Sequence, residues 1–494
     1  MIVNTSTVAN QPRGRGFFGQ PPGLSTLFFT EMWERFSYYG MRAILALYLY
    51  TAVADGGLGL DENRIAVPLV LAYGSSVYLT GVAGGWMADR VLGSQRAIFY
   101  GGVLIMFGHI AMAFPGGLPA LGVGLGLITI GSGLLKPNVS NVVGGLYDKE
   151  DTRRDAGFSI FYTGINLGAF ISQILTPALQ TGIGFHWGFG AAAVGMALGL
   201  IQYVLGRDRL GEAGRQPVNP LPADRRNTVL TRAAIVALLI LAALGGAVFL
   251  WGIPGLINTI TGISMVLPVA YFVVMFRSNQ ITKMERDRLL AYIPLFLSTA
   301  IFFLLFEQQA ATLVVVTDHQ TNTTVFGHEF PVGWFQSINP LAIIILAPLF
   351  AVMWTKLGQR QPSTPGKFVG GLVFVGIAFL WVVFSSLFTN AEGLLNPFMI
   401  AFVFVLLTIG ELMLSPVGLS ATTKLAPQAF SSQTMGLYFL APALGQGVAA
   451  QVTKLYSADH QNLYFGGVGI VTVFLGVVLA LLVPVIKKYM RGVL

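Results

Sequence analysis

The feature that most constrains this chain is a series of fourteen apolar segments separated by short breaks that are polar or contain Gly and Pro. A helix needs about 20 apolar residues to cross the hydrocarbon core of a bilayer. Only helices and closed barrels satisfy all their backbone hydrogen bonds there. We therefore expect an all-α integral membrane protein with 14 transmembrane helices, at 24–52, 64–88, 97–115, 118–145, 156–180, 186–206, 229–252, 256–276, 290–316, 332–355, 367–389, 396–418, 432–456 and 464–487.

The charged residues predict the orientation of these helices. Lys and Arg stay on the cytoplasmic side of a membrane. If the N-terminus is cytoplasmic, nearly all of them lie inside, from Arg13 and Arg15 to the last ones at 487–491; Arg64 and Lys454 lie outside, and Arg35, Arg42 and Lys136 lie within helices. We therefore interpret the net charge of +8 as a topology signal and not as nucleic-acid binding. We expect a multi-pass protein of the bacterial cell (inner) membrane with both termini cytoplasmic and no cleaved signal peptide.

Two charged stretches divide the chain. Residues 207–228 form a long linker that contains proline, and 277–289 form a shorter one. We predict a six-helix bundle at 24–206, an inserted helix pair at 229–276 and a second six-helix bundle at 290–488. The outer blocks resemble each other, with "TIGSGLLKP" at 129–137 matching "TIGELMLSP" at 408–416. Two like halves of six helices are the architecture of the major facilitator superfamily, whose substrate site lies between the halves.

The first apolar segment carries four charges that membrane helices normally avoid. In "LFFTEMWERFSYYGMRAILALYLY" at 27–50, the side chains of Glu31, Glu34, Arg35, Tyr38 and Arg42 fall within an arc of about 100° on a helix. Each charge at mid-bilayer costs at least about 2.5–3.5 kcal/mol, so the stripe requires an ion-paired or hydrated cavity. The remaining faces, with Trp33, Phe36, Ile44 and Leu47, are apolar.

Three further charges lie in other apolar segments. They are Lys136, Glu307 and Glu411. Four acids and three bases then share the membrane interior, and the set is neutral when one acid carries a proton. A carboxylate near a cation in low dielectric can exchange its proton as its partners move, which is what proton-coupled transport needs. The alternative is a purely structural set of ion pairs that holds the halves together.

Four motifs resemble those of the proton-coupled oligopeptide transporters, a branch of the major facilitator superfamily. They are "EMWERFSYYGMRAIL" at 31–45, "GLLKPNVS" at 133–140, "FYTGINLGAF" at 161–170 and "GELMLSPVGLSATTKLAP" at 410–427. The matches extend from residue 27 to about 445 in the expected order. The inserted helix pair is similar to that of bacterial members.

The resemblance implies a role for each residue. Glu31, Glu34, Arg35 and Glu307 would couple transport to protons, and Glu307 would also pair with Arg42 in an outer gate. Arg42 and Lys136 would bind the carboxylate of a peptide, and Glu411, Asn166 and Asn339 its ammonium group. The rest of the implied pocket is Tyr38, Tyr39, Tyr78, Ser415 and Tyr438. Asp89 and Arg90, in "GGWMADRVLGSQR", would steady an inward gate.

This chain departs from the family pattern at two places. It has "EQQA" at 307–310 where members commonly have "EQGS", and Tyr438 where an eleventh-helix Trp is common. The first change concerns gating and the second the pocket for substrate side chains.

We therefore expect a symporter that imports dipeptides and tripeptides, with peptide-like drugs as further substrates, protons as the coupling ion and no other cofactor. It would work as a monomer in the lipid bilayer. The alternatives are a transporter of nitrate or another small solute and a nontransporting receptor on the same scaffold. We find no nucleophile, base and acid set, so we do not expect an enzyme. His109 fits packing, and His319, expected in an outer loop, lacks metal-ligand spacing.

Overall fold

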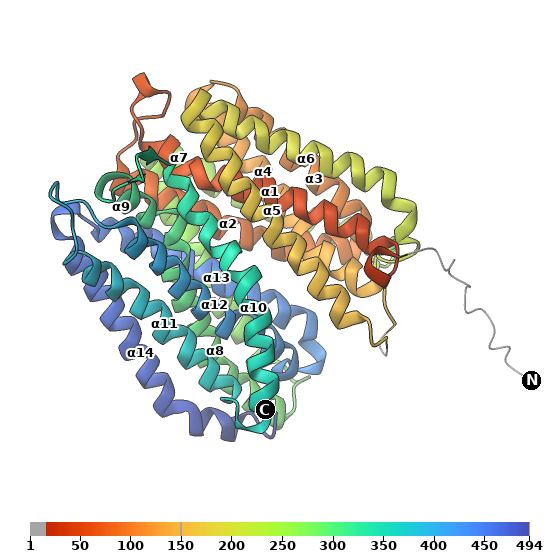
Figure 1. Ribbon diagram of the computed structural model, residues 1–494. Helices are drawn as coiled ribbons and strands as arrows, with labels where there is room; N and C mark the ends of the chain where they lie inside the picture. Colours follow the sequence, from red (N-terminus) through yellow and green to blue (C-terminus); the bar gives the residue numbers. More distant parts are fainter. Residues whose placement is uncertain (1–15, 149–150, 494) are drawn as a thin grey trace, which may run out of the picture.

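The computed structural model describes residues 16–148 and 151–493 of this 494-residue chain, and these form an all-α protein (Figure 1). Arg13, Arg15 and Lys149, which we used to predict the orientation, lie outside the described residues. The long helices are α1 (Gly23–Tyr50), α2 (Val67–Met87), α3 (Ser94–Ala113), α4 (Gly117–Gly145), α5 (Arg154–Ile183), α6 (Phe185–Gly206), α7 (Arg226–Arg277), α8 (Lys283–Phe306), α9 (Thr312–Gln320), α10 (Ile338–Leu357), α11 (Thr364–Ser385), α12 (Pro397–Leu425), α13 (Ser431–Val452) and α14 (Gln461–Tyr489).

Short elements connect these helices. The strands β1 (Thr324–Val325) and β2 (His328–Glu329) form a small antiparallel hairpin. The short helices are η1 (Phe17–Gly19), η2 (Val53–Asp55), η3 (Glu62–Ala66), η4 (Ala88–Leu92), η5 (Arg207–Leu210), η6 (Glu307–Ala310), η7 (Val332–Ser337), η8 (Gly358–Arg360), η9 (Gln428–Phe430), η10 (Thr453–Leu455) and η11 (Ala458–His460).

All fourteen predicted segments coincide with helical stretches of the structure. Within the described residues, eleven helices are long and apolar enough to cross a membrane by length and composition alone. That set leaves out α1, whose four charges are spread along its apolar sequence, and also α13, and it counts the two predicted segments of α7 as one helix. The all-α membrane fold is therefore confirmed.

The predicted pair at 229–252 and 256–276 forms one helical element, α7, with a sharp break. Gly252 has a left-handed backbone (φ 66°, ψ −157°), and Pro254 follows it. Essentially only glycine adopts this backbone conformation without strain. The glycine at this position is therefore the feature of the sequence that indicates the break. The second half of α7 packs on α2 and α13, whereas the first half leaves side chains such as Leu239 and Phe249 exposed.

The helices gather in two groups, coloured red to yellow and cyan to blue in Figure 1. Helix α1 packs on α5 and α6, and α3 packs on α4 and α6. In the second group α11 packs on α12 and α14, and α8 packs on α13. The groups meet where α2 lies against α13 and where α5 lies against α10. The domain boundaries 24–206 and 290–488, with linkers at 207–228 and 277–289, stay a prediction.

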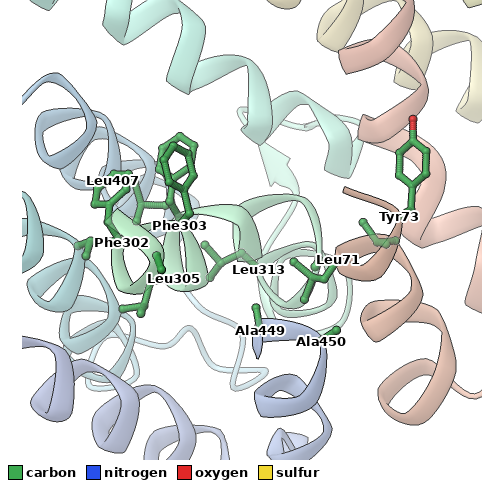
Figure 2. Close-up of a cluster of buried hydrophobic side chains, with 14 of the residues drawn as sticks. Leu71, Tyr73, Phe302, Phe303, Leu305, Leu313, Leu407, Ala449 and Ala450 are labelled. Carbon is green, nitrogen blue, oxygen red and sulfur yellow. The ribbon is translucent and has the colours of Figure 1, made fainter. Parts of the chain in front are cut away.

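The apolar core continues across the contact between the groups. Figure 2 shows part of it, with Leu71 and Tyr73 on α2, Phe302, Phe303 and Leu305 on α8, Leu313 on α9, Leu407 on α12, and Ala449 and Ala450 on α13. All of these side chains are buried in one cluster. Burial of apolar surface therefore fastens the two groups to each other, at about 25 cal/mol per Å².

Two ends of the molecule must be distinguished. Helix α1 begins at the end that carries residues 207–225, which we call the linker side. It ends beside η3 and α9, and the β1–β2 hairpin follows α9 in the chain, so we call this end the hairpin side. The linker side is the one that the distribution of Lys and Arg predicts to be cytoplasmic.

The predicted segment 290–316 is interrupted, which the sequence did not indicate. Between α8 and α9 the chain tightens into the 3₁₀ turn η6, and Ala311 is not helical (φ −137°, ψ −99°). The Gln308 side chain supports the break, because its amide donates to the Leu304 carbonyl at 3.1 Å and its oxygen accepts from Tyr464 of α14 at 2.8 Å. The interruption places Glu307 at the start of this turn.

Candidate functional site

The site is built around α1, which is buried on nearly all sides. Its apolar face meets glycines of α6: Trp33 lies against Gly199, Phe36 against Gly195 and Ile44 against Gly188. A Cβ at any of these glycines would come within 3 Å of the facing side chain. Small residues thus let α1 approach α6 closely, so its charged stripe faces away from α6 toward the second group.

Arg35 lies between two carboxylates on the same helix. Its Nε is 2.9 Å from Oε1 of Glu31 and 2.6 Å from Oε2 of Glu34, and all three side chains are buried. Within the described residues, neither oxygen of Glu34 accepts a well-directed hydrogen bond. One guanidinium therefore pairs with two carboxylates. If one carboxylate takes up a proton, the other still neutralises the charge of Arg35.

Arg42 and Glu307 form a buried ion pair between the two groups. Arg42 lies on α1, and its Nη2 donates to Oε2 of Glu307 at the start of η6. A buried pair of this kind is stable only while both partners are present, because removing one leaves an uncompensated charge. The pair therefore ties α1 to the break between α8 and α9.

Lys136 is held by aromatic rings. Its Nζ lies 4.1 Å from the ring centre of Tyr78 and 5.9 Å from that of Tyr38. Helices α2 and α4 fix this arrangement, because the hydroxyl of Thr80 donates to the Thr129 carbonyl at 2.9 Å. Within the described residues Lys136 makes no ion pair. A half-buried cation that contacts two ring faces and makes no ion pair among the described residues is suited to accept an anionic group.

The second group contributes a carboxylate. Asn339 of α10 donates to Oε2 of Glu411 at 3.0 Å and to the hydroxyl of Thr408 at 2.9 Å. Asn166, predicted to act with them, instead donates to the Tyr162 carbonyl of its own helix at 3.0 Å. The structure thus joins Glu411 with Asn339 and leaves Asn166 outside that hydrogen bond.

Tyr438 and Ser415 lie next to each other, as expected for one wall of a pocket. The Tyr438 hydroxyl donates to the Ser415 carbonyl at 3.2 Å, and the Tyr438 ring packs on Gly418. The Ser415 hydroxyl is buried and has no hydrogen-bond partner among the described residues. Tyr438 is therefore held by backbone contacts of α12.

The predicted residues gather in one region. Tyr39 lies within electrostatic range of Arg35, Glu307 and Glu411, and its ring meets that of Tyr38 edge-on with centres 5.2 Å apart. Tyr162 of α5 also lies within range of Glu411. Tyr162 was not among the predicted residues, although it lies in the motif "FYTGINLGAF" one turn before Asn166.

Asp89 and Arg90 lie elsewhere, in η4 on the linker side. Their backbone carbonyls accept hydrogen bonds from the amides of Asn219 (3.0 Å) and Leu221 (3.3 Å). The linker is thus bound to the turn between α2 and α3. The role of Asp89 and Arg90 in gating stays a prediction.

The hairpin side carries contacts that were not predicted from the sequence. The Tyr50 hydroxyl donates to Asp318 at 2.8 Å, and Nε2 of His319 lies 2.8 Å from Oε2 of Glu62. His319 therefore lies in helix α9, not in an outer loop, and it contacts η3. These contacts join the first group to the second at the hairpin side.

The linker side carries a cavity between the two groups. A cavity of about 640 Å³ lies between the start of α5, with Arg154 and Phe158, and the end of α12, with Ser420 and Thr423. Asp151 lies at its mouth and accepts two hydrogen bonds from the Arg153 guanidinium, at 2.8 and 3.1 Å, which lower the pKa of its carboxyl. The described contacts between the groups thus include a set at the hairpin side, whereas this cavity lies between them at the linker side.

Comparisons with known proteins agree with this arrangement. The model of the POT family matches residues 95–470. The "Uncharacterized transporter YclF" of Bacillus subtilis is 48% identical and covers 100% of this chain and 99% of its own length. The "Di-/tripeptide transporter" of Lactococcus lactis subsp. cremoris is 44% identical over 97% of this chain and 98% of its own length.

A solved structure is similar as well. The crystal structure of a peptide transporter POT in complex with alafosfalin has a TM-score of 0.92, is 48% identical and covers 97% of both chains. The protein has the fold of the major facilitator superfamily, and within that class it belongs to the POT family.

Proposed function

We propose that this protein is a proton-coupled symporter that imports dipeptides and tripeptides by alternating access. One observation supports the substrate class most directly. Cations, with Lys136 foremost, come from the first group, and the carboxylate Glu411 with Asn339 comes from the second. A zwitterionic peptide has the complementary charges at its two ends. The relative from Lactococcus lactis, a di-/tripeptide transporter, supports the same substrate class.

The coupling would use the two ion-paired sets on α1. A proton on Glu307 would release Arg42 from the second group, because a neutral carboxyl no longer holds the guanidinium. Arg42 would then join Lys136 on the peptide carboxylate. Protonation of Glu31 or Glu34 beside Arg35 would change the charge of the cavity in the same way. We assign no other cofactor to the cycle and no catalytic reaction to the protein.

The cycle would alternate between two shapes. The hairpin-side contacts and the linker-side cavity support the assignment of this structure to the shape that is open toward the cytoplasm, from which substrate would be released. In the other shape the contacts at Arg42 and Glu307, Tyr50 and Asp318, and His319 and Glu62 would break. We propose a monomer in the bacterial inner membrane with both termini cytoplasmic.

Uptake of labelled dialanine into proteoliposomes tests the proposal. An inward proton gradient should drive accumulation above the outside concentration. The Glu34→Gln variant should lose accumulation and retain exchange of peptide across the membrane, because only the coupling group is changed. Nitrate and a peptide-like drug serve as competing substrates.

Three results would contradict the proposal. Transport of nitrate without dialanine would favour another solute, although Glu411 disfavours an anion at that position. Binding of dialanine without any flux would favour a receptor. Accumulation by Glu34→Gln equal to that of the wild type would remove Glu34 from the coupling.

A further inference from the structure

An apolar groove lies outside the site, between the second half of α7, α8 and α13. Its volume is about 380 Å³, and its walls include Met265, Val269 and Phe272 of α7, Phe296 and Leu297 of α8, and Leu444 of α13. Met265, Val269 and Leu297 are about half exposed or more (51%, 61% and 48%), so the groove opens outward. In a membrane it faces lipid.

The length of the groove matches one leaflet. From Met265 to Arg277 the helix rises about 18 Å, at about 1.5 Å per residue. Half of the hydrocarbon core of a bilayer is about 15 Å thick. The groove therefore has the length of one extended acyl chain that enters from the linker side.

The linker-side end of the groove is positively charged. Arg277 is part of the lining, and Nη2 of Arg286 donates to the Phe276 carbonyl at 3.3 Å, which brings it to the same end. Both arginines are exposed, and neither makes an ion pair within the described part of the chain.

The acids next to these arginines are already engaged. Glu285 accepts hydrogen bonds from the amides of Thr282 and Gln428, both at 2.8 Å. Asp287 accepts from Nε of Arg491 at 2.8 Å. Two guanidinium groups thus remain available at the mouth of an apolar groove. Guanidinium binds phosphate oxygens through paired hydrogen bonds.

We propose that this groove binds one anionic phospholipid of the linker-side leaflet. Its acyl chain lies along Val269, Phe272 and Leu297, and its phosphate contacts Arg277 and Arg286. A headgroup with net negative charge fits because neither arginine makes an ion pair among the described residues, and basic sites between helices on the cytoplasmic side are typical for such lipids. The lipid joins the inserted helix pair to α8 and α13. This inference does not depend on which solute the protein moves.

Native mass spectrometry of the purified full chain tests the site. The protein in detergent is titrated with phosphatidylglycerol or with phosphatidylcholine of the same acyl chains, and with glycerol phosphate as the headgroup alone. We expect one phosphatidylglycerol to bind at least tenfold more tightly than phosphatidylcholine, and glycerol phosphate not to be retained.

Two pairs of variants separate the groove from nonspecific lipid. Arg277→Gln with Arg286→Gln should remove the tenfold preference, whereas Lys487→Gln with Lys488→Gln, equal in charge and also exposed on the linker side, should keep it. Val269→Trp fills the groove and should reduce lipid binding about tenfold. Val274→Trp, at a position equally exposed (61%) on α7 but outside the lining, should not.

Several results would overturn the proposal. They are equal binding of the two lipids, retention of glycerol phosphate alone, or equal losses in Val269→Trp and Val274→Trp. If the arginine variant does not fold, the two tryptophan variants still decide the matter.

Discussion

At the scale of single residues, Lys136 is the side chain most clearly prepared for a ligand. It contacts the rings of Tyr78 and Tyr38 and lies within electrostatic range of Glu34 and Glu307, but it forms no ion pair in the described residues. An anionic ligand would stabilise a cation in this environment, because the ligand accepts charge-assisted hydrogen bonds, which the aromatic rings cannot do.

Replacing Lys136 by alanine should therefore lower dialanine uptake about 10- to 100-fold. A hydrogen bond to a charged group contributes about 1.5–3 kcal/mol, and each 1.4 kcal/mol is tenfold in affinity. Lys136→Arg should retain part of the uptake. Lys454→Gln, a change on the hairpin side, should leave uptake unchanged. Wild-type uptake by Lys136→Ala would show that another group holds the carboxylate.

Glu411 should determine whether a peptide needs a free amino group to be transported. The wild-type protein is expected to take up dialanine much better than N-acetyl-dialanine, because the acetylated peptide leaves the buried carboxylate unpaired. In Glu411→Gln this ratio should shrink at least tenfold. Competition assays with both peptides measure the ratio, and Glu329→Gln, an exposed acid in β2, is the matched control. An unchanged ratio in Glu411→Gln would exclude Glu411 from amino-group recognition.

At the scale of elements, the break in α7 depends on one backbone conformation. Gly252 has φ 66° and ψ −157°, a region in which other residues are strained by about 1–3 kcal/mol. Gly252→Ala should therefore reduce the free energy of unfolding by about that amount in a denaturant or thermal titration. Gly246→Ala, in the same helix and with open space around its Cβ position, should be neutral or slightly stabilising. Equal stability of the two variants would mean that the break tolerates a side chain.

Most helices could be predicted from the sequence, because each apolar segment is long enough to span a bilayer. The breaks between the segments could be predicted from their Gly, Pro or charged residues. The break between α8 and α9 could not. It depends on Gln308, which bonds to Tyr464 more than 150 residues later in the chain. The same limit holds for the site. Charged residues such as Glu31 and Glu411 can be recognised one by one in the apolar segments of the sequence. The contacts of Tyr50 with Asp318 and of Glu62 with His319 could not be predicted in this way, because they join segments that are far apart in the chain.

At the scale of the whole molecule, the two groups are held together at the hairpin side. Asp318→Asn combined with Glu62→Gln should weaken this closure, because it removes both carboxylates that receive Tyr50 and His319. We expect a larger population with separated hairpin-side ends. Spin labels at Val53→Cys and Leu387→Cys report the distance, since both positions are exposed and the chain has no cysteine of its own. Glu392→Gln is the control, and an unchanged distance distribution in the double variant would contradict the prediction.

The orientation in the membrane can be tested with the same cysteine-free chain. Val53 at the hairpin side and Val218 in the linker are 73% and 83% exposed. A membrane-impermeant thiol reagent should label Val53→Cys in intact cells and Val218→Cys only after permeabilisation. The reverse pattern would place the linker outside the cell and would reverse the direction of the proposed transport.

The Gly252 break also matters for how such a chain can change during evolution. If the predicted inserted pair crosses the membrane twice, once on each side of Gly252, the segment from Arg226 to Arg277 begins and ends in the same compartment. A gene can therefore gain or lose this segment in one event without inverting any helix that follows it. The predicted pair would in this sense be a separable module, and outside the proposed lipid groove its lipid-facing sequence could diversify while the transport machinery stays intact.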